Sequence, residues 1–145
     1  MEVDPAGNHL KRRRVLVVDD AAMMRRWMEI KLGDTYEVSL AADGEEAVAM
    51  ALLVRPDLIL LDVEMPRMDG FATCRALRAL PRTVRTPIIL VTSRTEPADV
   101  ENGFVSGCTD FIGKPVDEVE LAVKIESWMA AADARHFAAR HFAAR

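Results

Sequence analysis

Short apolar runs alternate with longer amphipathic stretches along almost the whole chain, and this alternation is the strongest constraint on its fold. The runs typical of strands are residues 15–18, 36–40, 58–61, 88–91 and 110–113. The stretches between them have apolar side chains near helical spacing, and they predict helices at residues 21–32, 45–53, 71–80, 97–107 and 116–132. Strand–helix units repeated in this way predict an α/β fold with a parallel sheet between two layers of helices.

The composition of the strands indicates their order in the sheet. Residues 58–61 and 88–91 are continuously apolar, as in strands covered on both faces, whereas residues 36–40 alternate and suit an edge. This difference favours the flavodoxin-like (βα)5 arrangement, a doubly wound parallel five-stranded sheet with the order 2-1-3-4-5. Ligands of such folds bind beyond the carboxyl ends of the strands, so we look for chemistry at that edge.

Length and composition exclude several classes of protein. The 145 residues leave room for one domain, which we expect at residues 13–132, between a flexible N-terminal arm (1–12) and a C-terminal basic tail (133–145). A net charge of −4 disfavours direct nucleic-acid binding, and no apolar run is long enough to span a membrane. Cys74 and Cys108 lie far apart without a metal-binding motif, so we expect buried thiols in a cytoplasmic protein.

Carboxylates follow two strands that we expect to lie inside the sheet. Asp19 and Asp20 come directly after the first strand, and Asp62 follows the third. Each like-charged pair at ~4 Å costs roughly 4 kcal/mol at an effective dielectric constant near 20, so such a cluster predicts a bound cation. Oxygen ligands in a small acidic site suit Mg²⁺ or Mn²⁺. Taken singly, Asp20 is also an ordinary N-cap and Asp62 an ordinary strand end.

A hydroxyl and an ammonium group lie at the ends of the fourth and fifth strands. Thr92 ends the fourth strand, and Lys114 directly precedes Pro115 after the fifth. Because the cations of this chain are mostly arginine, a lysine at this place predicts a compact charge against a phosphoryl oxygen or a carboxylate. Together with a metal ion, these side chains form a phosphoryl-transfer site in which Asp62 is the nucleophile.

These motifs resemble those of a response regulator receiver domain of two-component signalling. The matching segments are residues 15–20, 60–70, 88–93 and 110–115. The resemblance covers residues 13 to 130, nearly the whole chain. It implies that Asp62 accepts a phosphoryl group from a histidine side chain of a partner protein.

The resemblance also implies a ligand set for the metal ion and a place for the lysine. Asp20 and Asp62 bind Mg²⁺ directly, Asp19 helps, often through water, and the backbone carbonyl of Glu64 supplies another ligand. Lys114 pairs with the phosphate. The peptide bond between Lys114 and Pro115 is expected to be cis.

A switch pair and two lifetime-tuning residues follow from the same resemblance. Thr92 moves toward the bound phosphate, and the ring of Phe111 turns inward. Glu64 and Arg94, which lie two residues after Asp62 and Thr92, flank the path of the hydrolytic water. We expect a Glu64–Arg94 pair to shield the site and to lengthen the phosphoryl lifetime; two unrelated solvated charges are the alternative.

The predicted function is phosphorelay signalling by a stand-alone receiver that switches its partner-binding surface. The predicted phosphodonor is a sensor histidine kinase or a histidine phosphotransfer protein. An output protein is expected on the face formed by the fourth helix, the fifth strand and the fifth helix. We expect a monomer or a phosphorylation-dependent dimer that contacts neither nucleic acid nor a membrane. Catalysis is limited to self-phosphorylation and slow autodephosphorylation, so the chain is not predicted to be an enzyme.

Three other interpretations stay open at this point. The chain is a receiver fragment of a larger multidomain regulator, a phosphatase that forms an aspartyl phosphate, or a flavin-binding module. Haloacid dehalogenase-like phosphatases have a second aspartate two residues after the nucleophile, where this chain has Glu64. A flavin module needs a Ser/Thr-rich loop after the first strand, where Asp19 and Asp20 would repel a phosphate.

The C-terminal tail contains the repeat Arg-His-Phe-Ala-Ala, at residues 135–139 and 140–144. Five residues advance a helix by about 140°, so Phe137 and Phe142 do not share one face. One interpretation is a duplicated or frayed tail. The other is a basic helical extension that docks on a partner.

Overall fold

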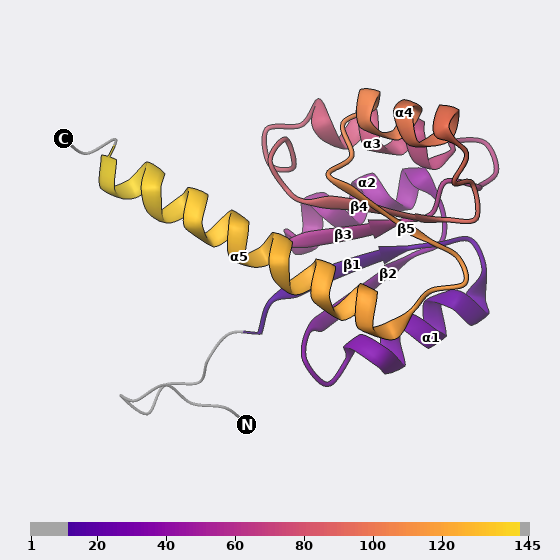
Figure 1. Cartoon of the computed structure of the whole chain (residues 1–145), viewed down its shortest axis with the longest axis horizontal. Coiled ribbons are helices and arrows are strands. Elements are labelled where there is room, and N and C mark those ends of the chain that lie inside the picture. The colour runs from indigo at the N-terminus through magenta and orange to yellow at the C-terminus, as the bar shows by residue number, and fades with distance from the viewer. Residues whose placement is uncertain (1–11, 143–145) are drawn as a thin grey trace.

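Five parallel strands form the centre of the molecule, with helices on both faces (Figure 1). The computed structural model describes residues 12–142. The strands are β1 (Arg14–Val18), β2 (Glu37–Ala41), β3 (Leu58–Leu61), β4 (Ile88–Thr92) and β5 (Asp110–Gly113). The helices are α1 (Ala22–Leu32), α2 (Gly44–Val54), α3 (Gly70–Arg78), α4 (Pro97–Val105) and α5 (Glu118–Phe142).

The strand order is β2-β1-β3-β4-β5, and every neighbouring pair is parallel. This order confirms the predicted flavodoxin-like fold. It also explains the sequence pattern, because β3 and β4 are buried along their whole length whereas the edge strand β2 is exposed or half-buried at all but its last residue.

Successive side chains of the central strands enter two separate cores. Leu16, Ile59 and Leu90 pack on the side of α2 and α3, and the residues that follow each of them pack against α1 and α5. Each fully buried leucine or isoleucine contributes about 1.5–3 kcal/mol relative to an exposed one. Packing on both faces holds the sheet in place. The carboxyl ends of its strands are therefore also held in fixed positions.

Both cysteines are buried on the α2–α3 side, as predicted. Burial, with a further contribution from the neighbouring Cys74, raises the pKa of the Cys108 thiol to about 12. A thiol with so high a pKa is inert at neutral pH.

The end of the last helix differs from the sequence prediction. A helix ending near residue 132 is wrong, because α5 continues to Phe142 and extends past the sheet (Figure 1). Residues 130–142 are rich in alanine and contain neither glycine nor proline, so nothing in that segment ends a helix. Most of the expected N-terminal arm (1–11) and residues 143–145 lie outside the described residues.

No helix within residues 12–142 is both long enough and apolar enough to cross a membrane.

Candidate functional site

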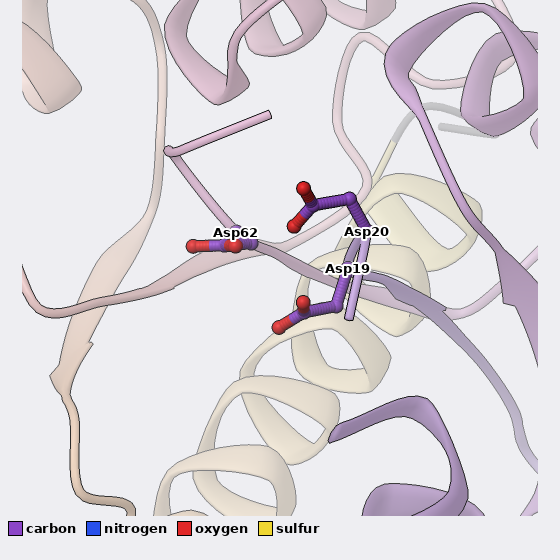
Figure 2. A group of neighbouring side chains, drawn as sticks. All are labelled: Asp19, Asp20 and Asp62. Carbon is purple, nitrogen blue, oxygen red and sulfur yellow. The ribbon is translucent and has the colours of Figure 1, made fainter. Parts of the chain in front are cut away.

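The three predicted carboxylates meet at the carboxyl edge of the sheet. Asp19 and Asp20 follow β1 and Asp62 follows β3, and these strands are neighbours with Val18 in register with Leu61. One carboxylate oxygen from each aspartate lies within 4.8 Å of the others. Figure 2 shows the three side chains facing a common space.

Local hydrogen bonds hold the two buried carboxylates in place. Asp19 is 3% exposed, and its Oδ1 accepts a hydrogen bond of 2.9 Å from the backbone N–H of Ala21. Asp62 is 5% exposed, and its Oδ1 lies 3.4 Å from the backbone nitrogen of Glu64. Asp20 is exposed, so this carboxylate can exchange water for another ligand without leaving a buried charge.

Lys114 reaches the same cluster from β5. Its Nζ donates to Oδ2 of Asp19 at 2.9 Å and lies 3.6 Å from Oδ2 of Asp62. Partial burial lowers the pKa of the ammonium group, but the hydrogen bond to Asp19 and the charge of Asp62 outweigh burial and raise it overall. Lys114 is therefore a fixed positive charge at neutral pH. The Lys114–Pro115 peptide bond is cis, the form that the family resemblance implies.

The surroundings of Asp62 shift the pKa of its carboxyl group strongly. Burial raises the pKa of its carboxyl group, and the charge of Asp19 raises it further; Lys114 and backbone N–H groups oppose this, leaving a value of about 6. The ionised carboxylate is thus held in a less favourable environment than water offers. A bound cation, or conversion of the carboxylate to an acyl phosphate, can relieve this unfavourable electrostatic environment.

Thr92 is fully buried at the end of β4, and its hydroxyl already has a partner. The backbone N–H of Arg94 donates to Oγ1 of Thr92 at 3.0 Å. The expected Glu64–Arg94 pair does not occur: the guanidinium of Arg94 binds Oδ1 of Asp99 at 2.8 Å instead. The guanidinium also lies over the ring of Phe71, 5.6 Å from its centroid.

The ring of Phe111, a residue of β5, packs against α4. Its ring centroid is 5.8 Å from that of Phe104, with the planes tilted by 52°. The ring also lies directly on Gly103, where an added Cβ would be 2.4 Å from Cε2 of Phe111. Phe111 is half-buried in this arrangement, so its ring has both an apolar contact and an exposed side.

Two residues of the site escaped the sequence analysis. Gly70 begins α3 against the backbone of Asp62, and a Cβ there would be 2.2 Å from the carbonyl oxygen of Asp62. The Asp-Gly pair that opens this helix could have indicated such a close approach. Arg25 donates to the backbone carbonyl of Asp19 at 2.7 Å, and nothing in the sequence marks this arginine among the others.

The donor set at this edge fits a small divalent cation. Three carboxylate oxygens lie close enough to contact one ion, and they are the hard ligands that Mg²⁺ and Mn²⁺ prefer. The side chains of Asp19, Asp20 and Asp62 are therefore able to hold such an ion. No thiol or imidazole belongs to this group, so it is unlike a zinc site.

Comparison with known proteins gives matches over most of the chain. Residues 15–126 match the model of the family described as the response regulator receiver domain. Response regulator PleD of Caulobacter vibrioides is 47% identical over 115 residues, which are 79% of this chain and 25% of PleD. The chain spans between 25% and 54% of the length of the curated relatives that it matches first.

Solved structures match nearly along their whole length. The chemotaxis protein CheY4 of Vibrio cholerae is 37% identical with a TM-score of 0.77, and the match covers 80% of this chain and 98% of CheY4. The receiver domain of the sensor histidine kinase PA1611 from Pseudomonas aeruginosa PAO1 is 33% identical with a TM-score of 0.77, over 82% of this chain and 98% of that domain. That structure has a magnesium ion coordinated in its active site cleft.

Proposed function

Because the chain belongs to the response regulator receiver domain family of two-component signalling, we propose that Asp62 is its phosphoacceptor and that phosphorylation switches its partner-binding surface. Receiver domains are generally regulatory rather than catalytic. The observation that carries the proposal is the placement of Asp62, a buried carboxylate that lies 3.6 Å from the ammonium of Lys114 and shares this ammonium with a second carboxylate, Asp19. In this proposal the receiver unit is residues 13–132, which include the matched residues 15–126.

The phosphodonor is the phosphohistidine of a sensor histidine kinase or of a histidine phosphotransfer protein. An oxygen of Asp62 attacks the phosphorus atom, the new O–P bond forms, and the P–N bond to the imidazole breaks. The imidazole leaves as the neutral ring after taking a proton, and an acyl phosphate stays on Asp62. The donor supplies the reactive bond, so the residues of this chain mainly position it and neutralise charge.

Five neighbours of Asp62 share this work. Lys114 already lies 3.6 Å from Asp62 and pairs with one phosphoryl oxygen after transfer. The hydroxyl of Thr92 donates to another oxygen. Asp19 and Asp20, with Asp62 and the backbone carbonyl of Glu64, hold a Mg²⁺ ion, which neutralises part of the charge on the phosphoryl group when it is bound.

The structural switch follows from the hydrogen bond that Thr92 must give up. When its Oγ1 turns to the phosphate, the N–H of Arg94 loses its acceptor, and the loop between β4 and α4 rearranges. The vacated space admits the ring of Phe111. The face of α4, β5 and α5 then changes its shape, and an output protein reads that change. Phe104 and Val123 are exposed apolar side chains on this face.

Glu64 and Arg94 retain a role as tuners of the phosphoryl lifetime in this proposal. Glu64 is exposed beside Asp62, while Arg94 is held by Asp99. The chain's own chemistry is then self-phosphorylation and slow hydrolysis of its acyl phosphate.

Incubation with acetyl phosphate and Mg²⁺, followed by intact-protein mass spectrometry, tests the proposal. We expect one phosphoryl adduct on the wild type and none on Asp62→Asn. The matched control is Asp34→Asn, an exposed aspartate far from the sheet edge, which should be phosphorylated like the wild type. An adduct that persists in Asp62→Asn rejects this residue as the acceptor.

The same assay separates the receiver from an aspartyl-phosphate phosphatase. A receiver gives a stable adduct and little turnover of general phosphate esters, whereas a phosphatase releases phosphate from many of them. Loading with beryllofluoride before a pull-down, with unloaded protein as the control, then tests for an output partner that prefers the activated form.

A further inference from the structure

A basic groove lies at the end of the molecule opposite to the acidic cluster. Three adjoining hollows, the largest of about 540 Å³, share Ala132 of α5 as a wall, and together they form the groove. Arg14 lines it at the start of β1, whereas Asp19 follows the other end of that strand. In Figure 1 this is the end at which the strands begin and past which α5 extends.

The charge of the groove is opposite to that of the chain. Seven arginines line it, in a chain whose net charge is −4. Its described carboxylates are Asp57 and Asp133, and both have partners: Asp57 accepts from the backbone N–H of Arg14 at 2.8 Å, and Asp133 pairs with Arg13. The positive charge of the groove therefore greatly exceeds its negative charge.

Most of these arginines have no carboxylate of their own. Within the described part of the chain, no ion pair is formed by the following lining residues: Arg12, Arg55, Arg82, Arg85 and Arg135. Arg12 and Arg82 donate only to backbone carbonyls, of Gly33 and Leu52. Arg55 and Arg85 are exposed, and among residues 12–142 no acceptor binds their guanidinium groups, which can therefore bind an external acceptor.

From this arrangement we propose that the groove binds an acidic segment of a partner protein. Guanidinium groups match carboxylates in charge and in fork geometry. The walls also include Pro81 and the exposed Val84, which offer apolar contact between the charges. A segment in which acidic and apolar residues are mixed satisfies both features.

A protein segment fits better than a nucleic acid. A continuous phosphate backbone would lie against the carboxylates of Asp57 and Asp133 and would be repelled by them. A peptide also has backbone N–H groups, which can donate hydrogen bonds to these carboxylate oxygens. The groove is distant from Asp62, so the binding does not rest on the proposed phosphorylation.

A fluorescently labelled peptide in which glutamate and leucine residues alternate is the probe, and its anisotropy is measured with the full chain at ~0.1 M salt. The groove variant is Arg55→Gln combined with Arg85→Gln. The control, Arg26→Gln combined with Arg67→Gln, removes the same charge from exposed sites elsewhere. We expect the groove variant to bind the peptide at least about tenfold more weakly and the control to change affinity less than about twofold.

Circular dichroism of each variant verifies that it is folded before binding is compared. Equal weakening in both variants, or no binding by the wild type, overturns the proposal, because a general charge effect then explains the result. A labelled oligonucleotide measured in parallel is the second probe. Tighter binding of the oligonucleotide through the same arginines also overturns it, since the groove is then a nucleic-acid site.

Discussion

Asp62 combines two properties that oppose each other in a folded protein: it is buried, and it must be ionised to act as a nucleophile. Burial and the nearby charge of Asp19 raise the pKa of its carboxyl group to about 6. In the unfolded chain the same group has its ordinary pKa near 3.8. Ionisation of Asp62 therefore lowers the free energy of unfolding of the metal-free domain. The reactive carboxylate is present at the expense of stability.

This exchange predicts a pH dependence that belongs to Asp62. Because the pKa is higher in the folded state, the destabilisation is fully present above pH 6 and disappears as the pH falls from about 6 to about 4. At pH 7 without metal, we expect Asp62→Asn to raise the free energy of unfolding by about 2 kcal/mol. Urea denaturation at pH 7 and pH 5 measures this gain, which should shrink at the lower pH.

The control for this measurement is Asp34→Asn, which removes a carboxylate that is exposed to solvent. Its effect on the free energy of unfolding should be within about 0.5 kcal/mol at both pH values. A loss of stability in Asp62→Asn at pH 7 would falsify the account, because it would mean that the ionised carboxylate stabilises the fold.

The sequence predicted which residues meet at this site because the carboxyl ends of parallel strands define one edge. It could not predict the partner of Arg94. That choice depends on the distance from the β4–α4 loop to Asp99, which only the packed position of α4 sets. Gly70 and Arg25 were missed for the same reason, since both act through contacts with the backbone of Asp62 and Asp19, and the packed positions of α3 and α1 set those contacts.

At the scale of elements, the approach of α4 to β5 depends on Gly103. The ring of Phe111 occupies the space that a Cβ at this position would need, and Cδ1 of Leu90 would be only 2.9 Å from that Cβ. We expect Gly103→Ala to lower the free energy of unfolding by about 1–3 kcal/mol and to displace the ring. Thermal unfolding and NMR signals of the Phe111 ring measure the two effects.

A double-mutant cycle isolates this contact from helix propensity. In the background of Phe111→Ala the two closest contacts are gone, and only the flexible end of the Leu90 side chain is still near the added Cβ. Alanine is favoured over glycine inside α4 by about 1 kcal/mol. Gly103→Ala should therefore be neutral or stabilising in that background. The same loss of stability in both backgrounds would show that the ring is not the obstacle.

A second element-scale feature is Arg78, the last residue of α3, whose side chain donates hydrogen bonds to several backbone carbonyl groups. Its guanidinium donates to the carbonyl oxygens of Thr83 at 2.8 Å, Thr86 at 2.6 Å and Gly107 at 2.7 Å. Partial burial lowers the pKa of this guanidinium. The contacts connect the loop before β4 with the turn before β5, so one side chain satisfies two connections.

We expect Arg78→Met to lower the free energy of unfolding by about 2–4 kcal/mol, because it leaves several half-buried carbonyl groups without donors. Arg75→Met is the matched control, since Arg75 lies one turn earlier on α3 and makes a single hydrogen bond, to Oγ of Ser106. It should cost less than about 1 kcal/mol in chemical denaturation. Similar losses in both variants would contradict the role assigned to Arg78.

Element boundaries were predictable where the sequence contains a stop signal and not where it lacks one. Gly33 follows α1 and Pro97 begins α4, and both ends lie near their predicted places. The alanine-rich end of α5 has no such signal, and its helix continues beyond the sheet because nothing in the chain opposes it. Helix propensity decides this end, whereas Gly33 and Pro97 mark the other two.

At the scale of the whole molecule, the parallel sheet separates charge along its strands. The carboxyl edge collects Asp19, Asp20 and Asp62, and the opposite end collects the arginines of the basic groove. A net charge of −4 does not reveal this separation, because it averages the two ends. Cations are therefore attracted to one end of the molecule and acidic partners to the other.

Binding of Mg²⁺ at the carboxyl edge should stabilise the whole domain, since it relieves repulsion between the ends of β1 and β3 and the domain unfolds cooperatively. At about 100 times the dissociation constant, a ligand that binds only the folded state adds about 2.7 kcal/mol, which raises Tm by several degrees. We expect this rise in MgCl₂ but not in NaCl of equal ionic strength. Asp20→Asn removes an exposed ligand without creating a cavity, so it should lose most of the rise, while Asp34→Asn should keep it. An equal rise in both variants would place the ion elsewhere, and the cluster at the sheet edge would then be only a local electrostatic cost.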